Sequence, residues 1–217
     1  MSIGTDVGTV AGRTEHAGLR ARKKDATRRA LAEAAMNLAI EHGYAAVTIS
    51  DITRAVGVSR RTFSNYFTGK AECIVAVTQG WFDDIVQSIR DAPVEHQLDR
   101  ILCDALLRVA TDLPERWERL FPLLHAEPEL KAMVGAVDEN NVGQLCRVVA
   151  ARLGTSPHDI RVRMLATFGN IAGRTCLEEW VLGGRPGGER SFGQQLALAF
   201  SIIDLNSLTA PVLPPTP

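Results

Sequence analysis

The sequence VTISDITRAVGVSRRTFSNYF occupies residues 47–67 and predicts two short helices separated by a sharp turn. Thr48 can cap the first helix through its hydroxyl, and Asp51 three residues later can complete a capping box. Gly57 permits the left-handed exit that a residue with a Cβ rarely makes. Ser59 then caps the second helix, so the segment has the layout of a helix-turn-helix.

The second of these helices, predicted over residues 59–67, has one apolar and one polar face. Phe63 and Phe67 share one side and are expected in the core, whereas Arg61 and Asn65 fall on the opposite side. Arginine pairs with guanine and asparagine with adenine in the major groove, so this outward face suits base reading. A polar, solvent-facing helix is the alternative, and the two caps, the glycine turn and the adjacent arginines favour base reading over it. The candidate base-reading residues are Arg60, Arg61, Thr62 and Asn65.

The distribution of charge also separates the two ends of the chain, although the net charge is only −1. Residues 1–72 carry 11 lysines and arginines against 7 acidic residues, whereas the remainder carries 13 against 18. Most of the positive excess lies within residues 11–30. This asymmetry indicates a polyanionic partner at one end only, and a solvated, solubilising tail is the alternative.

Residues 26–76 contain a series of short segments in a fixed order: His42-Gly43-Tyr44, Thr48-Ile49-Ser50-Asp51-Ile52, Gly57-Val58-Ser59-Arg60-Arg61-Thr62-Phe63, Asn65-Tyr66-Phe67 and Gly69-Lys70-Ala71-Glu72. This combination resembles the DNA-binding domain of the TetR family of transcriptional regulators. The resemblance implies that the N-terminal part of the second helix reads bases. It also implies a ligand-binding and dimerisation domain from about residue 90 onward. Ser64 departs from the family pattern, which often has an aromatic residue that touches the DNA backbone there.

Phosphate contacts are expected from two parts of the basic region. Thr48, Tyr66 and Lys70 match the family's phosphate-contacting positions, and Tyr66 and Lys70 also flank the base-reading face. Arg22, Lys23 and Lys24 would precede the first helix as an arm that lies over the DNA backbone or enters a minor groove.

The fold class predicted from the whole chain is all-α, with about nine helices. β signals are nearly absent, and apolar residues recur at helical spacing almost throughout. We expect a disordered N-terminal extension over 1–20, the DNA-binding domain over 21–72, a helical effector-binding and dimerisation domain over 73–208, and a disordered tail over 209–217. The helices expected after residue 70 cover 71–90, 97–112, 114–125, 128–153, 158–182 and 191–208.

Several classes of protein and site are excluded or disfavoured. No stretch is long and apolar enough to span a membrane, and residues 1–18 lack a signal core, so we expect a cytoplasmic protein without a membrane partner. The four cysteines lie at least 30 residues apart, and the histidines show no metal-binding spacing. No phosphate-binding glycine loop follows a strand. We therefore expect no metal, no cofactor and no enzymatic activity.

The last two predicted helices have features of a dimer interface. Apolar residues lie on more than one face of the last helix, and small residues in the preceding helix would let another helix approach closely. We expect a homodimer through a four-helix interface, and a monomer with one thick core is the alternative. The expected interface residues are Gly169, Ala172, Leu196, Phe200 and Ile203.

The region between residues 97 and 182 combines large apolar side chains at irregular spacing with a few polar ones, which suits an internal ligand pocket. We expect a hydrophobic effector, of which acyl compounds are one class, with an anionic group facing Arg174. The alternative is that the aromatic residues fill the core and the asparagines face water. The candidate pocket residues are Trp81, Trp117, Phe121, Met133, Asn140, Phe168, Asn170 and Arg174.

These features together predict a ligand-responsive, sequence-specific DNA-binding transcriptional regulator. The expected mode is a repressor that a hydrophobic small molecule releases from a palindromic operator on double-stranded DNA. A regulator without a small-molecule effector is one alternative, and a helical small-molecule binding protein or enzyme is another.

Overall fold

The structure is a computed structural model of the 217-residue chain, and it describes residues 8–93, 95–111 and 117–202. Within these ranges the protein consists of ten α-helices and one short 3-10 helix, η1, without a strand. The predicted all-α fold class is therefore confirmed. The chain divides into two compact units, an N-terminal unit (residues 1–77) and a C-terminal unit (residues 78–217).

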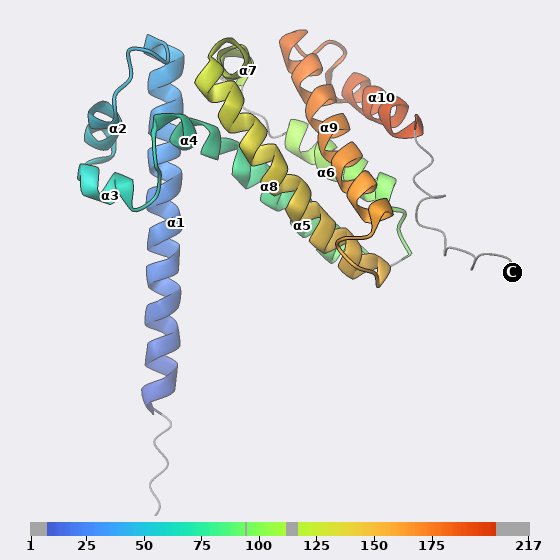
Figure 1. Ribbon diagram of the computed structural model, residues 1–217, viewed down its shortest axis with the longest axis horizontal. Coiled ribbons are helices and arrows are strands. Elements are labelled where there is room, and N and C mark those ends of the chain that lie inside the picture. The colour runs from blue at the N-terminus through green and yellow to red at the C-terminus, as the bar shows by residue number, and fades with distance from the viewer. Residues whose placement is uncertain (1–7, 94, 112–116, 203–217) are drawn as a thin grey trace, which may run out of the picture. The chain divides into compact units, whose positions relative to one another are not determined.

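The N-terminal unit is built on one long helix. The helices α2, α3 and α4 gather at the C-terminal end of α1, which packs directly against α2 and α4 (Figure 1). Leu31 and Met36 of α1 and Ile52, Phe63 and Ile74 of the shorter helices are almost fully buried and form the core of this unit. The bounds of its helices are α1 (Gly8–His42), α2 (Ile49–Val56), α3 (Arg60–Ser64) and α4 (Lys70–Val75).

The N-terminal half of α1 differs from the expectation for residues 1–20. The sequence predicts a disordered extension there, whereas α1 begins at Gly8 and runs without interruption to His42. The segment contains no proline, and a helix that is already nucleated by the packed residues 31–39 extends at low cost per added residue. The tail expected to be disordered, residues 209–217, lies outside the described residues.

In its described residues, the C-terminal unit is a bundle of six α-helices. Helices α8 and α9 lie side by side, α7 packs against both of them, and α10 packs against α9 and α6 (Figure 1). No helix in the described ranges is both long enough and apolar enough to cross a membrane. The bounds are α5 (Gln79–Asp91), α6 (Leu98–Thr111), α7 (Trp117–Ala126), α8 (Pro128–Leu153), α9 (Ile160–Leu182) and α10 (Gly188–Ser201).

The helix predicted over residues 71–90 is interrupted. The structure has α4, then the 3-10 helix η1 (Ala76–Thr78), and then α5. Val75, Val77 and Thr78 are β-branched and lower the helix propensity at this point. The interruption coincides with the division between the two units at residues 77 and 78.

Four of the five residues expected at a dimer interface are instead buried inside one protomer. A Cβ added to Gly169 would lie 3.4 Å from Leu102 Cδ1, so this glycine lets α6, rather than a partner subunit, approach α9. Leu196 and Phe200 are at most 5% exposed, and the Phe200 ring meets Phe168 edge-on at 5.9 Å. Ala172 is also buried, and Ile203 lies outside the described residues. These four residues therefore already have neighbours in their own chain and present little surface to a partner subunit.

Candidate nucleic-acid interface and effector site

The entry to α2 has the predicted capping box. Thr48 Oγ1 accepts a hydrogen bond from the Asp51 backbone N–H at 3.3 Å and donates to Asp51 Oδ2 at 2.6 Å. The Thr48 backbone N–H donates to the same carboxylate oxygen at 3.1 Å. At the other end of α2, Gly57 has φ +72°, the left-handed conformation that favours glycine. The helix and the turn after it are therefore held by local contacts.

The exposed face of α3 carries the candidate base-reading residues. Ser59 caps the helix by accepting from the Thr62 backbone N–H at 3.0 Å, and the Thr62 hydroxyl lies 2.9 Å from Ser59 Oγ. Phe63 anchors the inner face and is 1% exposed. Arg60, Arg61 and Asn65 are exposed, whereas Thr62 is half-buried and engaged with the cap. The structure thus places Arg60, Arg61 and Thr62 on one short helix and Asn65 directly after it, with Thr62 less accessible than the other three.

The helix is shorter than the predicted 59–67. It ends at Ser64, with Asn65 as its C-cap. The carbonyl of Phe63 accepts from the backbone N–H groups of both Tyr66 and Phe67, so the chain tightens into a turn there. Phe67 still returns to the core, with its ring 5.6 Å from that of Phe63.

The three residues near the turn that are expected to contact phosphates differ in how accessible their polar groups are. Lys70 is half-buried, and its ammonium donates to the carbonyls of Tyr44 at 2.9 Å and Val47 at 3.1 Å, above the Tyr44 ring. Two of its three N–H groups thus hold the loop before α2. Thr48 is exposed, but its hydroxyl already donates a hydrogen bond to the Asp51 carboxylate. Tyr66, which follows the end of α3, is half-buried.

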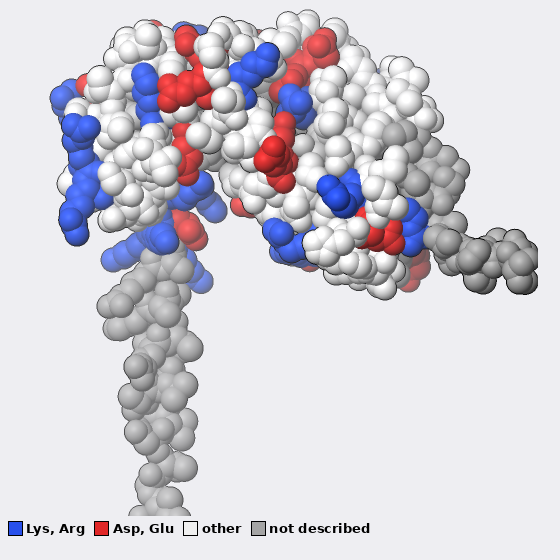
Figure 2. All heavy atoms as spheres, viewed as in Figure 1, with Lys and Arg blue, Asp and Glu red and all other residues white. Residues whose placement is uncertain are grey.

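The basic residues of α1 lie on the same unit as α3. Arg22, Lys23 and Lys24 are exposed on α1. Figure 2 shows lysine and arginine side chains gathered over α2, α3 and the middle of α1. These three residues belong to the continuous helix α1, and not to a separate arm that precedes the first helix. A helix is about 10–12 Å wide and a minor groove about 6 Å, so α1 itself is too wide to enter the groove. We therefore expect these residues to contact the DNA backbone.

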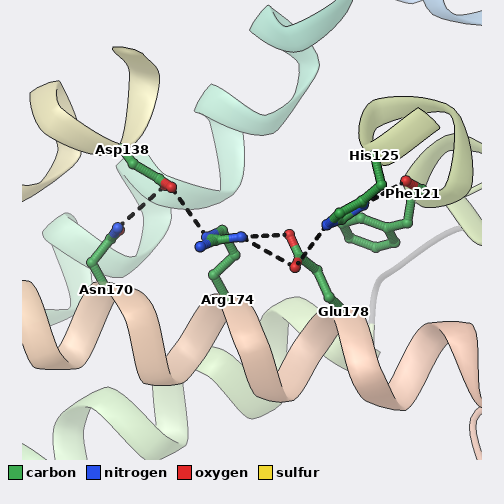
Figure 3. Close-up of polar contacts among 6 residues, drawn as sticks. All are labelled: Phe121, His125, Asp138, Asn170, Arg174 and Glu178. Atoms are coloured by element: carbon green, nitrogen blue, oxygen red, sulfur yellow. Dashed lines mark hydrogen bonds and ion pairs between the residues drawn. The ribbon is translucent and has the colours of Figure 1, made fainter. Parts of the chain in front are cut away.

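The C-terminal unit holds a polar network that joins three helices (Figure 3). Arg174 of α9 lies between two carboxylates: its Nε is 3.1 Å from Asp138 Oδ2, and its Nη1 is 3.1 Å from Glu178 Oε1. Asn170 donates to Asp138 Oδ1 at 3.2 Å. His125 of α7 places Nε2 3.3 Å from Glu178 Oε2 and Nδ1 2.8 Å from the Phe121 carbonyl oxygen. Two acidic side chains therefore hold the Arg174 guanidinium, which the sequence predicts to face an anionic ligand group.

Three of the candidate pocket residues form one aromatic cluster. The rings of Trp81 and Trp117 are 3.7 Å apart, and those of Trp117 and Phe121 are 5.8 Å apart. Phe121 therefore joins this aromatic cluster to the polar network, because its carbonyl binds His125. Five of the eight candidates, including Asn170 and Arg174, thus belong to two connected groups.

The other three candidates have different surroundings. Phe168 faces Phe200, Met133 is half-buried on α8, and Asn140 is exposed. The next residue, Asn141, is the buried one. A separate open groove of about 540 Å³ between α5 and α6, lined by Asp84 and Asp104 among others, contains none of the eight candidates.

Comparison with known proteins identifies the family. The family model for bacterial regulatory proteins of the tetR family matches residues 31–77, which include the capped helices α2 and α3. A curated relative, the HTH-type transcriptional regulator TcmR of Streptomyces glaucescens, is 28% identical over 208 residues, covering 83% of this chain and 84% of TcmR. The protein is a TetR-family transcriptional regulator.

Solved structures of TetR-family proteins share the fold. A structure described as a TetR-family regulator, from Syntrophomonas wolfei, has a TM-score of 0.60 at 16% identity and covers 82% of this chain and 95% of its own. The TetR-family repressor FadR of Thermus thermophilus, solved with lauroyl-CoA, has a TM-score of 0.52 at 20% identity and covers 88% of this chain and 98% of its own. At 16% and 20% sequence identity, the structural similarity establishes a shared fold and no shared ligand.

Three members of the regulator's polar network, His125, Asp138 and Glu178, are not among the eight candidate pocket residues predicted from the sequence. A histidine, an aspartate and a glutamate on separate helices are ordinarily solvated. One signal is present, because Asn170, Arg174 and Glu178 recur at intervals of four and therefore share one face of α9. Their partners, His125 on α7 and Asp138 on α8, are brought close only by tertiary packing, so no spacing in the sequence predicts them.

The capping box of this TetR-family protein predicts an acid-dependent contribution to stability. Hydrogen bonds from the Thr48 hydroxyl and then from its backbone N–H lower the pKa of Asp51. Because the pKa is lowered in the folded state, this stabilisation is present above the ordinary carboxyl pKa and is lost as pH falls through the folded value. Thr48→Val should lower the Tm by about 2–4 °C near neutral pH, as expected for the loss of one cap.

The measurement is thermal unfolding of wild type and Thr48→Val from neutral pH to below about pH 4, with the difference in Tm shrinking towards the acid end. Thr27→Val is the matched control, since the Thr27 hydroxyl donates only to the Lys23 carbonyl within α1. A difference in Tm that stays constant across the pH range would contradict the role of the Asp51 carboxylate.

Proposed function

We propose that this TetR-family regulator binds a palindromic operator on double-stranded DNA in the cytoplasm, with α3 in the major groove. The observation that carries the proposal is the exposure of Arg61 on α3 and of Asn65 at its C-cap, on a helix that Ser59 caps and Phe63 anchors in the core. Arg61 would contact guanine, Asn65 adenine, and Arg60 and Thr62 would support them. Thr48, Tyr66 and Lys70 would contact phosphates beside the bases.

The second element of the proposal is a homodimer. On α9, Ile160, Met164 and Ile171 share one face and are between 49% and 65% exposed. Leu198 of α10 and Ile202, the C-cap residue of that helix, are 68% and 74% exposed and lie four residues apart. Exposed apolar patches of this kind are typical of protein contacts. Two copies joined through these faces would match the two-fold symmetry of a palindrome.

The third element is release from the operator by a small hydrophobic effector bound in the C-terminal unit. The aromatic cluster of Trp81, Trp117 and Phe121 would supply an apolar wall, and the polar network would supply a few orienting groups. The complex of the relative FadR with lauroyl-CoA shows that this fold accommodates such a ligand in another protein. An effector that binds one conformation of the dimer better than the other would shift it away from the DNA-bound form.

The test is selection of genomic DNA fragments that the full-length protein retains. The proposal predicts recovered fragments that share a palindrome whose half-sites are about 34–36 Å apart, or a multiple of that distance. Recovery of fragments without a shared sequence would contradict sequence-specific regulation. In that case, the function of a small-molecule binding protein would explain the C-terminal unit better than that of a regulator.

The basic residues of α1 are expected to strengthen DNA binding without changing the preferred sequence. Exchange of Lys23 and Lys24 for alanine removes two exposed charges that would contact phosphates. The slope of log affinity against log salt should become shallower by about 0.9 for each phosphate that the variant no longer neutralises. Binding of selected and scrambled duplexes at several salt concentrations measures this, with Lys131→Ala, an exposed lysine of α8, as the control. An unchanged slope would show that α1 does not touch the DNA.

A further inference from the structure

The exposed apolar face of α9 is interrupted by an acidic residue. Its apolar members, Ile160, Met164, Ile171 and Leu182, are each between 49% and 65% exposed. Glu178 lies seven residues after Ile171 and four before Leu182, so the helical repeat places it in the same row. Its side chain is only 13% exposed. A carboxylate therefore lies within the surface that the proposed homodimer would cover.

Glu178 belongs to the polar network that joins α7, α8 and α9 (Figure 3). Arg174 lies 3.1 Å from Glu178 and 3.1 Å from Asp138, so one positive charge faces two negative ones. Both Glu178 oxygens accept from Arg174 Nη1, which holds the carboxylate in place. The remaining negative charge is balanced only if His125, which contacts Glu178 from α7, carries a proton on both ring nitrogens.

The contact between His125 and Glu178 is attractive only when the imidazole is protonated. Nδ1 lies 2.8 Å from the Phe121 carbonyl oxygen, which only accepts, so Nδ1 carries a hydrogen. In the neutral ring, Nε2 then presents a lone pair to Glu178 Oε2 at 3.3 Å. In the imidazolium, Nε2 donates to the same oxygen. The His125 side chain is 45% exposed, so water can deliver and remove this proton.

The other charges around His125 do not reverse this preference. Within the network the two carboxylates outnumber the arginine. Glu127 and Glu129 follow His125 at the start of α8, and acids nearby favour an imidazolium. On α7 itself, Glu118 lies two turns earlier and pairs with Arg185. The surroundings of the ring are therefore negative overall.

Dimerisation would increase the cost of the unbalanced charge. Water solvates the network at the surface of a monomer, whereas a partner subunit packed on the α9 face would remove that water. Burial of a charge without a counter-charge is costly, and a matched, hydrogen-bonded pair is less costly to bury. The attraction between the His125 imidazolium and Glu178 also strengthens as the local dielectric constant falls. The dimer therefore favours the protonated histidine more than the monomer does.

We propose that dimerisation of this regulator is linked to protonation of His125. Each protomer takes up about one proton as the dimer forms, so the dimer is favoured as pH falls. The inference rests on the homodimer of the proposed function, because it names a regulatory input to the same interface. A dimer engages both half-sites at once, so operator affinity should rise together with the dimer.

Sedimentation of the full-length protein without DNA measures the dimer dissociation constant at about pH 6 and about pH 8, the range in which histidines generally change charge. The wild-type constant should be at least about tenfold larger at the higher pH. His125→Gln cannot take up a proton, and its constant should agree within about twofold at the two pH values. Because His125 is an exposed residue, this variant should fold. His96→Gln, at an exposed position between α5 and α6, is the matched control and should keep the wild-type ratio.

Glu178→Gln tests the sign of the charge argument. It removes the unbalanced negative charge, so its dimer should be tighter than the wild-type dimer at the higher pH and insensitive to pH. Where the wild-type dimer is too tight to dissociate, the comparison is made in a Leu198→Ala background, since Leu198 is 68% exposed on the proposed interface.

A dissociation constant that is the same at both pH values in the wild type, or smaller at the higher one, would overturn the inference and leave the homodimer standing. A His125→Gln variant that keeps the wild-type ratio would do the same. A wild-type protein that is monomeric at both pH values would overturn the homodimer of the proposed function as well.

Discussion

The double variant Ile171→Glu, Leu198→Glu is expected to be a folded monomer that binds the operator about 10²- to 10⁴-fold more weakly than wild type. Both side chains are exposed, at 49% and 68%, so neither exchange buries a charge within the protomer. In a dimer, however, the new carboxylates would be desolvated without a partner. The loss of affinity is large because one protomer engages only one half-site at a time.

Sedimentation and operator titration of the same preparations measure this effect. Gln87→Glu places the same charge on an exposed position of α5 and should leave both the mass and the affinity unchanged. Phe200→Glu is a poor test, since Phe200 is 5% exposed and its exchange would destabilise the protomer itself. A double variant that remains dimeric would show that the exposed faces of α9 and α10 do not form the interface.

Arg61→Ala should reduce operator affinity by about 1–3 kcal/mol and relax the preference at one base pair in each half-site. Arg61 is exposed near the N-terminal end of α3, where a recognition helix meets base edges. Arg61→Lys separates charge from geometry: lysine keeps the charge but lacks the planar fork that pairs with guanine. It should retain the salt dependence and lose the base preference.

Affinity for a panel of operators that differ at single positions measures the preference. Arg163→Ala, an exposed arginine of α9, controls for general loss of positive charge. If Arg61→Ala kept the wild-type order of preference across the panel, α3 would not be the base-reading element.

The DNA-binding unit can be predicted closely from the sequence because its signals are local. The Thr48 and Asp51 box, the Gly57 turn and the Ser59 cap each involve residues no more than three apart, so their spacing alone specifies the contacts. Lys70 illustrates the limit of such patterns. Its ammonium binds carbonyls 23 and 26 residues earlier in the chain, and no sequence pattern predicts that.

The C-terminal unit can be predicted from the sequence at the level of helices but not of contacts. The small residue Gly169 correctly indicates a close helix approach, yet the helix that approaches is α6 of the same protomer. The pattern on a helix shows that a face is buried, not which neighbour buries it. The same limit applies to Arg174: Glu178 lies four residues later on the same helix, but its other partner, Asp138, comes from the folded arrangement of α8 and α9.

The most direct test of the central claim, sequence-specific operator binding by α3, is a competition between two duplexes of equal length. One carries the palindrome recovered by selection, and the other carries the same bases with both half-sites scrambled. The full-length protein should prefer the palindrome by at least about a thousandfold, and binding to both should weaken steeply as salt increases. Equal affinity for the two duplexes at every salt concentration would contradict the claim.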